Sequence, residues 1–389
     1  MLPSLFQRHF LLLVIVSIVL SITVQVFLFM GGEYLSSQLA QTQARTSGVP
    51  TATPTVAATP VPTQPATFYQ RPAFQTGVVF PQWSSTGYGP NDPEWQQGLY
   101  DIRAQAGARW LEMPILFSQD SPTSTQVTNG PSTPTVESIA AGIRAARALG
   151  YHVFVVPLLG VIGPGEWAAS IHFSTYQEEE QWFNNFWQTF QPYAVAAEVA
   201  GAEQLSIGTE EVWLQQHAPA ALWDTLIARV RRVFSGTITY DMNWTTVSDT
   251  PPTWMSNQNL GMIGVSEYIP LVDVRERLDP PVIFRLWRDK IKRVLDDLSI
   301  RLQKPIVISE IGYRNSADAL YHPWFPESTV SPPDPVEQAA ACDAALANVI
   351  TDPHIAGIFF WGWDAVGGFK LSGQSAVRVL HKWYTSPQS

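Results

Sequence analysis

The chain from residue 74 onward alternates two hydrophobic patterns. Short runs that are almost continuously apolar, and rich in β-branched and aromatic residues, predict strands that are buried on both faces. Between them lie segments in which apolar residues recur every three or four positions, as Phe183, Phe186 and Phe190 do, and this spacing predicts helices. The predicted strands are 76–83, 108–117, 151–159, 203–210, 237–244, 261–269, 305–313 and 356–363.

Eight such strand-helix repeats predict a single (β/α)8 TIM barrel, because parallel strands that are buried on both faces need a helix after each strand. The helix starts fit this order, since Asp92 and Asp334 can act as N-cap residues and a proline follows each of them. A doubly wound sheet is the alternative, but no glycine-rich phosphate loop follows the first strand to support it.

The first 72 residues do not have the pattern of a barrel. Residues 10–30 carry no charge, and at ~1.5 Å per residue they span roughly the ~30 Å of a bilayer core. Arg8 precedes them and Glu33 follows, so the rest of the chain is expected outside the cytoplasm. We expect a cytoplasmic tip and transmembrane signal anchor at 1–33, a Pro/Thr-rich stalk at 34–72 and an extracytoplasmic folded domain at 73–389, which is secreted if the N-terminal segment is cleaved.

Composition and charge narrow the classes of partner. The net charge of −10 argues against nucleic acid, and nothing in the sequence indicates a protein partner. Cys342 is the only cysteine, and the seven histidines show no HxH, HxxxH or HExxH spacing, so we expect no zinc site and no cofactor. A metal site built from scattered carboxylates stays open. The 15 Trp residues fit either a core or flat faces for a sugar ligand.

Candidate chemistry lies where the predicted strands end, because TIM barrels place functional side chains at the carboxyl ends of their strands. The segment "SIGTEEVW" at 206–213 offers two acids there. Leu205 and Ile207 are expected to face the helices, so alternation turns Glu210 into the barrel mouth. Glu211 comes one residue later and is expected on the rim. In "PIVISEIGY" at 305–313, Glu310 is the only acid.

Two glutamates at the ends of different strands, without a metal motif, match what retaining glycoside hydrolysis requires. One carboxyl is protonated to assist the leaving oxygen and the other is ionised to attack the anomeric carbon, at a separation of roughly 5 Å. Burial and a neighbouring negative charge are expected to raise the pKa of the acid, whereas hydrogen bonds from groups such as Tyr268 keep the nucleophile ionised. The alternative is that Glu210 or Glu310 only closes the barrel top in an ion pair.

Four segments carry a family resemblance: "IGTEE" (207–211), "IGVSEYIPL" (263–271), "PIVISEIGYRN" (305–315) and "GIFFWGWDAVGG" (357–368). They resemble the clan A glycoside hydrolases, and within that clan the chain is most similar to glycoside hydrolase family 113, known for endo-β-1,4-mannanase activity. The resemblance covers about residues 74 to 385.

The resemblance implies roles for individual residues. Glu210 is then the acid/base and Glu310 the nucleophile, and Tyr268 hydrogen-bonds the nucleophile. A tryptophan of the last strand forms the floor for the sugar, Trp361 in preference to Trp363. Further substrate-binding candidates at strand ends are Trp83, Thr209, Asn243, Trp244 and Tyr313.

The resemblance has departures that bear on the sugar. Many clan A members place Asn immediately before the acid/base, where its amide holds the sugar 2-hydroxyl, whereas this chain has Thr209. Specificity for mannan is therefore less well supported than retaining hydrolysis. Glucan, xylan or galactan are alternative substrates, endo or exo action stays open, and a catalytically silent barrel that binds carbohydrate is the alternative from another class. Glu267, next to Tyr268, is the main rival carboxylate and is expected to face the helices or the rim.

Overall fold

The computed structural model describes residues 74–163, 165–325, 331–365 and 368–386. The predicted anchor at 1–33 and the predicted stalk at 34–72 lie outside these residues. Within the described ranges, the structure contains no helix whose length and hydropathy would let it cross a membrane.

Eight parallel strands form a closed barrel, as the sequence predicts. β1 pairs with β2 on one side and with β9 on the other, and this last pairing closes the ring. A short strand, β3 (Thr128–Asn129), adds to β2 in the antiparallel direction. The barrel strands are β1 (Gln75–Val79), β2 (Trp110–Gln119), β4 (His152–Val161), β5 (Gln204–Thr209), β6 (Thr237–Asn243), β7 (Ile263–Glu267), β8 (Ile306–Ile311) and β9 (Ile355–Phe360).

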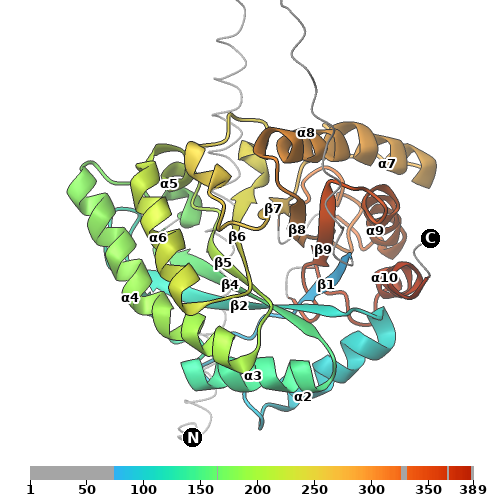
Figure 1. Cartoon of the computed structure of the whole chain (residues 1–389). Helices are drawn as coiled ribbons and strands as arrows, with labels where there is room; N and C mark the ends of the chain where they lie inside the picture. Colours follow the sequence, from blue (N-terminus) through green and yellow to red (C-terminus); the bar gives the residue numbers. More distant parts are fainter. Residues whose placement is uncertain (1–73, 164, 326–330, 366–367, 387–389) are drawn as a thin grey trace, which may run out of the picture. The chain divides into compact units, whose positions relative to one another are not determined.

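Helices follow the strands and surround the barrel (Figure 1). Asp92 caps the first of them by accepting a hydrogen bond from the Trp95 amide at 2.9 Å, and Asp334 caps α9 in the same way, so both predicted N-caps are confirmed. The α-helices are α2 (Pro93–Asp101), α3 (Val136–Ala148), α4 (Tyr176–Ala200), α5 (Val212–His217), α6 (Ala220–Val233), α7 (Pro280–Trp287), α8 (Arg293–Leu302), α9 (Pro335–Val349) and α10 (Ser375–Thr385). Short 3-10 or π turns occupy Ile102–Ala106, Ala168–Ser170, Trp244–Thr246, Thr253–Ser256 and Arg288–Lys292.

The two faces of each strand serve different cores. Leu205 and Ile207 pack in the large core between strands and helices, which confirms the alternation expected for β5. A smaller apolar cluster fills part of the barrel interior and includes Val79, Phe154 and Phe359. The interior is not apolar throughout, because buried polar side chains, among them Glu112, Gln204, Ser206 and Asp241, also stand on the strands.

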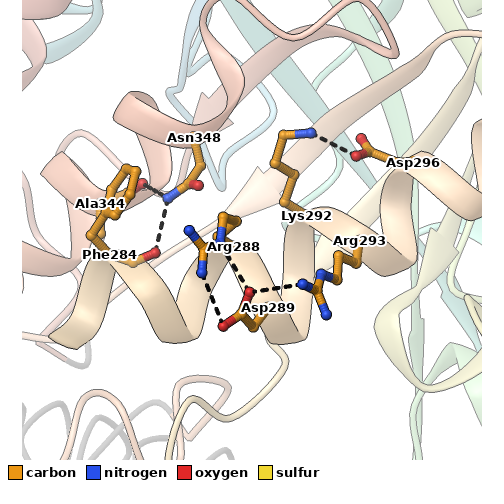
Figure 2. A network of polar contacts seen from close by, with 8 residues as sticks. All are labelled: Phe284, Arg288, Asp289, Lys292, Arg293, Asp296, Ala344 and Asn348. Atoms are coloured by element: carbon orange, nitrogen blue, oxygen red, sulfur yellow. Dashed lines mark hydrogen bonds and ion pairs between the residues drawn. The ribbon is translucent and has the colours of Figure 1, made fainter. Parts of the chain in front are cut away.

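Polar contacts fix the helical segment that leads into β8 (Figure 2). The Asn348 amide on α9 donates to the carbonyl oxygens of Phe284 on α7, at 3.2 Å, and of Ala344, at 2.8 Å. Further along the segment, Lys292 donates to Asp296 at 2.6 Å and also pairs with Asp352. The Asn348 bond ties α9 to α7, and the Lys292–Asp352 pair, with its buried carboxylate, adds a second contact between this segment and the residues after α9.

Candidate active site

Glu210 follows β5 in a conformation that is rare for glutamate. Its φ of 64° lies in the left-handed region, which costs about 1–3 kcal/mol for a residue with a side chain. Its amide donates to the Asp241 carbonyl oxygen at 2.9 Å, so β6 holds the strained turn in place. Asn243, the last residue of β6, donates from Nδ2 to Glu210 Oε1 at 2.9 Å. The turn and the Asn243 amide together fix where the Glu210 carboxyl lies.

Glu310 lies near the end of β8 and has its own dedicated donor. The Tyr268 hydroxyl, directly after β7, donates to Glu310 Oε1 at 2.5 Å. Ser266 on β7 stands opposite Glu310 in the strand register, and its side chain also lies close enough to Glu210 to stabilise that carboxylate. The ends of β5, β6, β7 and β8 therefore bring the two predicted glutamates into one site.

The electrostatics of the two carboxyls are coupled. Burial raises the pKa of Glu210, and the side chains of Asn243 and Ser266 offset only part of this effect. Burial also raises the pKa of Glu310; the negative charge of Glu210 adds to it, and the Tyr268 hydrogen bond acts in the opposite direction. From the sequence we expected Tyr268 to keep Glu310 ionised, but its hydrogen bond does not hold the pKa of Glu310 in the ordinary range. Since each charge disfavours the other, the pair holds its last proton to a higher pH than a lone carboxyl would.

Glu211 is not on the rim, and this expectation was wrong. Its side chain is 1% exposed, and a Cβ added to Gly208 would lie 2.6 Å from Glu211 Oε2. Burial raises the pKa of Glu211 to about 7, against weaker stabilisation from backbone groups and from the Tyr240 hydroxyl. β5 ends at Thr209 and Glu210 has a left-handed φ, so strand alternation no longer decides where the next side chain lies.

Aromatic side chains gather after the carboxyl ends of the barrel strands, the end at which the two glutamates lie. Trp83 after β1 is 42% exposed, and its ring centre lies 6.4 Å from that of Trp361 after β9, with 39° between the rings. Trp244, which directly follows Asn243, stacks on Trp324 at 5.2 Å and 29°. Each pair joins residues from distant parts of the chain. Trp83, Trp244 and Trp361 follow the ends of β1, β6 and β9, and Trp324 lies in the long segment between β8 and α9.

The barrel fold agrees with the comparisons. The sequence profile described as Glycoside Hydrolase Family 113 matches residues 83–375, well over half of the chain. The chain belongs to glycoside hydrolase family 113. It is therefore a glycoside hydrolase with a TIM-barrel fold, as the resemblance indicated. A search of curated proteins gave no match.

Solved structures similar to this family 113 member share its fold. The β-mannanase AaManA from Alicyclobacillus acidocaldarius is 22% identical with a TM-score of 0.68, and the match covers 80% of this chain and 97% of that one. A second family 113 β-1,4-mannanase is 22% identical with a TM-score of 0.69, covering 81% and 99%. A family 5 mannosidase from Rhizomucor miehei is 12% identical with a TM-score of 0.56, covering 81% and 94%.

Two residues that we expected to bind substrate lie elsewhere in this family 113 barrel. Trp363 is 1% exposed and belongs to the hydrophobic core. Tyr313 is 3% exposed, and its hydroxyl accepts a hydrogen bond from Trp287 Nε1 at 2.9 Å, so it faces α7. The predicted strands ran too far: β8 ends at Ile311 and β9 at Phe360, and both residues belong to the turns that follow.

Thr209 and Glu267 are also buried, in different surroundings. Thr209 is 5% exposed, and no residue that the structure describes hydrogen-bonds its Oγ1. Glu267 is 1% exposed and accepts a hydrogen bond from the Ile269 amide at 2.8 Å. The hydroxyl of Thr209 is thus buried, which does not support the expected contact with the sugar, whereas Glu267 is tied to the backbone that follows β7.

The sequence analysis did not single out Trp324, an aromatic residue near the barrel mouth. Trp324 lies between β8 and α9, and the tryptophan in "YHPWFP" was the available signal, although a long loop does not disclose where its side chains lie. The ranges described here contain no group of three or more His, Cys, Asp or Glu side chains suited to a metal ion.

Proposed function

We propose that this family 113 hydrolase cleaves β-linked mannan by a retaining double displacement, with Glu310 as nucleophile and Glu210 as acid/base. The observation that carries the proposal is the pair of glutamates at the ends of β5 and β8, each with its own hydrogen-bond donor. Retaining hydrolysis needs two carboxyls in different protonation states, and the repulsion between two neighbouring carboxylates favours a pair that holds one proton.

In the first step Glu310 attacks the anomeric carbon as the glycosidic bond breaks, and Glu210 gives its proton to the leaving oxygen. The product is a glycosyl ester on Glu310. In the second step Glu210, now ionised, removes a proton from water, which attacks the anomeric carbon and releases Glu310 as a carboxylate. Asn243 donates to Oε1 of Glu210, which leaves Oε2 to carry the proton.

The aromatic pairs are suited to hold the sugar chain. Apolar faces of pyranose rings stack on aromatic rings, so we propose that exposed Trp83 and half-buried Trp361 form the floor next to the carboxyls. The stacked Trp244 and Trp324 extend this surface beyond Asn243.

Mannan is the first substrate to test, because the similar solved structures include β-1,4-mannanases. A panel of mannan, glucan, xylan and galactan, read by release of reducing ends, identifies the sugar, and the sizes of early products separate endo from exo action. A preference of more than tenfold in rate for another polysaccharide would replace mannan in the proposal.

The roles of the two glutamates are tested by substitution. Glu310→Gln removes the nucleophile without changing its size, and we expect a loss of more than ~10³-fold in kcat. Glu210→Ala should recover part of its rate with azide, or with substrates whose leaving group needs no proton. Glu337→Gln is the matched control, because Glu337 is a buried acid on α9. Wild-type kcat in Glu310→Gln would refute the assignment.

We further propose that residues 1–33 anchor the enzyme in the membrane, with the barrel outside the cytoplasm. The proposal rests on the uncharged run at 10–30 and the basic residue before it. Membrane fractionation of the full chain, with protease added to intact cells, tests it. Recovery of uncleaved enzyme in the soluble cytoplasmic fraction would contradict it.

A further inference from the structure

Beneath the two glutamates, the barrel interior holds an acid that the mechanism above does not use. Asp241 on β6 is 1% exposed. The hydroxyls of Ser206 on β5, Thr239 on β6 and Ser309 on β8 lie around its carboxyl. Asp241 Oδ2 and Ser309 Oγ are buried and have no hydrogen-bond partner among the described residues. Gly264 on β7 provides the space, since a Cβ there would overlap Asp241 Oδ1 and lie 2.9 Å from Ser309 Oγ. This is a polar chamber built across four neighbouring strands.

No cation compensates Asp241 within the described part of the chain, where its carboxyl takes part in no ion pair. The ionisable groups around it are Glu112 on β2, Glu211 after β5 and its neighbour Tyr240. Ionisation of Asp241 would therefore place a charge in a buried site that holds other acids and no base, which is strongly unfavourable. Burial raises the pKa of Asp241 well above its ordinary value, and the surrounding hydroxyls offset only part of this.

The hydrogen bonds of Ser206 point to the same protonation state. Its hydroxyl donates to the Gly208 carbonyl oxygen at 2.7 Å and accepts from the Gly208 amide at 3.4 Å. A hydroxyl has one proton and two lone pairs. While its proton points to the Gly208 carbonyl oxygen, Ser206 can only accept from Asp241, and a protonated carboxyl supplies that donor; if the hydroxyl turns toward a charged Asp241, the Gly208 bond is lost. Thr239 donates to Asp241 Oδ1 at 3.4 Å.

We propose that Asp241 is an uncharged positioning residue that packs between β5 and β8 inside the barrel and sets the separation of the two catalytic carboxyls. Ser206 stands four residues before Glu210, and Ser309 directly precedes Glu310. The Asp241 backbone also accepts the hydrogen bond from the Glu210 amide. The inference rests on the proposed function for the roles of the glutamates, but the protonation of Asp241 does not depend on it.

Activity tests the positioning role. Asp241→Leu fills the space without a donor, and we expect kcat to fall about 100-fold, with KM within ~3-fold, because small displacements of reacting groups have effects of this size. Asp241→Asn restores an uncharged donor to Ser206 and should rescue kcat to within ~3-fold of wild type at pH 6. Ser309→Ala removes the contact on β8 and serves if Asp241→Leu does not fold. Wild-type kcat in Asp241→Leu, or in Ser309→Ala, would overturn the positioning role.

Unfolding measurements test the protonation state without any substrate. If Asp241 is neutral in the folded chain and ionises on unfolding, a rise in pH favours the unfolded wild type. The ratio of the unfolding constants of wild type and Asp241→Asn should then rise about tenfold per pH unit from ~pH 5 upward. A ratio that stays flat would show that Asp241 is charged in the folded state and overturn the proposal.

The two experiments separate the two proposals. If the wild type cleaves no polysaccharide but the ratio of unfolding constants rises with pH, the proposed function fails and the neutral Asp241 stands. If Glu310→Gln is inactive but Asp241→Leu has the wild-type kcat, the function stands and the positioning role fails. Glu337→Gln, remote on α9, controls for the general loss of a buried acid and should keep the wild-type kcat.

Discussion

Tyr268→Phe isolates the contribution of a single hydrogen bond to the proposed nucleophile. The substitution removes the hydroxyl that donates to Glu310 Oε1 at 2.5 Å and leaves the ring in place. That ring is 7% exposed and packs edge-on against Phe369 at 6.2 Å. Packing is therefore preserved, and any change in catalysis reports on the missing donor.

The size of the effect follows from the charge on the acceptor. A hydrogen bond to a charged group contributes ~1.5–3 kcal/mol, which equals about 1–2 pKa units. Tyr268 stabilises the ionised form of Glu310, so its loss should raise the apparent pKa of the coupled pair. Because attack requires an ionised Glu310, the acidic limb of kcat/KM should move to higher pH by ~1–2 units, with a fall of ~10–100-fold in kcat/KM below it.

The assay is the pH dependence of kcat/KM with an activated aryl glycoside, whose leaving group needs little help from Glu210. Tyr384→Phe is the matched control: Tyr384 is a buried tyrosine on α10 that donates to the Gly77 carbonyl oxygen at 2.9 Å. The control should lose stability but keep the position of the acidic limb. If Tyr268→Phe leaves the limb in place and the rate within twofold, Tyr268 has no role in ionising Glu310.

Three further substitutions test other parts of the site. Asn243→Ala removes the donor to Glu210 Oε1 and should lower kcat by ~10-fold or more while KM changes little. The lost hydrogen bond to a charged group corresponds to ~1.5 kcal/mol. A change confined to KM would contradict this. Trp324→Ala should raise KM for polysaccharide by ~5–20-fold but not for a short aryl glycoside, in line with ~1–2 kcal/mol per aromatic contact; equal effects on both would place Trp324 outside the substrate surface. Glu267→Gln tests linkage in urea titrations. Burial raises the pKa of Glu267 to about 8, so the stability from its neutral form is complete below ~pH 4.5 and is lost as pH rises to ~8. Relative to the variant, the free energy of unfolding should fall by ~1.4 kcal/mol per pH unit in this range. Parallel stability curves for the two proteins would refute a neutral Glu267.

The barrel and its two glutamates could be predicted from the sequence because both depend on local patterns. Near-continuous apolar runs mark strands that are buried on both faces, and in a TIM barrel the ends of such strands converge on one mouth. Glu210 and Glu310 therefore lie in one site although a hundred residues separate them. The alternation within β5 correctly separated Leu205 and Ile207 from the interior.

The misplaced residues lie where the local pattern stops. Strand alternation predicts side-chain direction only while the strand continues, and β8 and β9 end before Tyr313 and Trp363. For Glu211 the cause is the left-handed φ of the preceding residue, which no residue type announces. Trp324 depends on how a long loop packs against Trp244, and such tertiary contacts leave no periodicity in a single sequence.

The tryptophan pair at the mouth has a consequence for the order of folding. Trp83 follows the first strand of the barrel and Trp361 the last, and the two strands meet in the pairing that closes the ring, with Val78 opposite Phe360. Contacts between such distant segments form late, and a chain emerging from the ribosome folds from its N-terminal side. A nascent chain that has displayed Glu210 and even Glu310 still lacks the proposed floor for the sugar, so we expect the enzyme to bind substrate only when its final strand has been added.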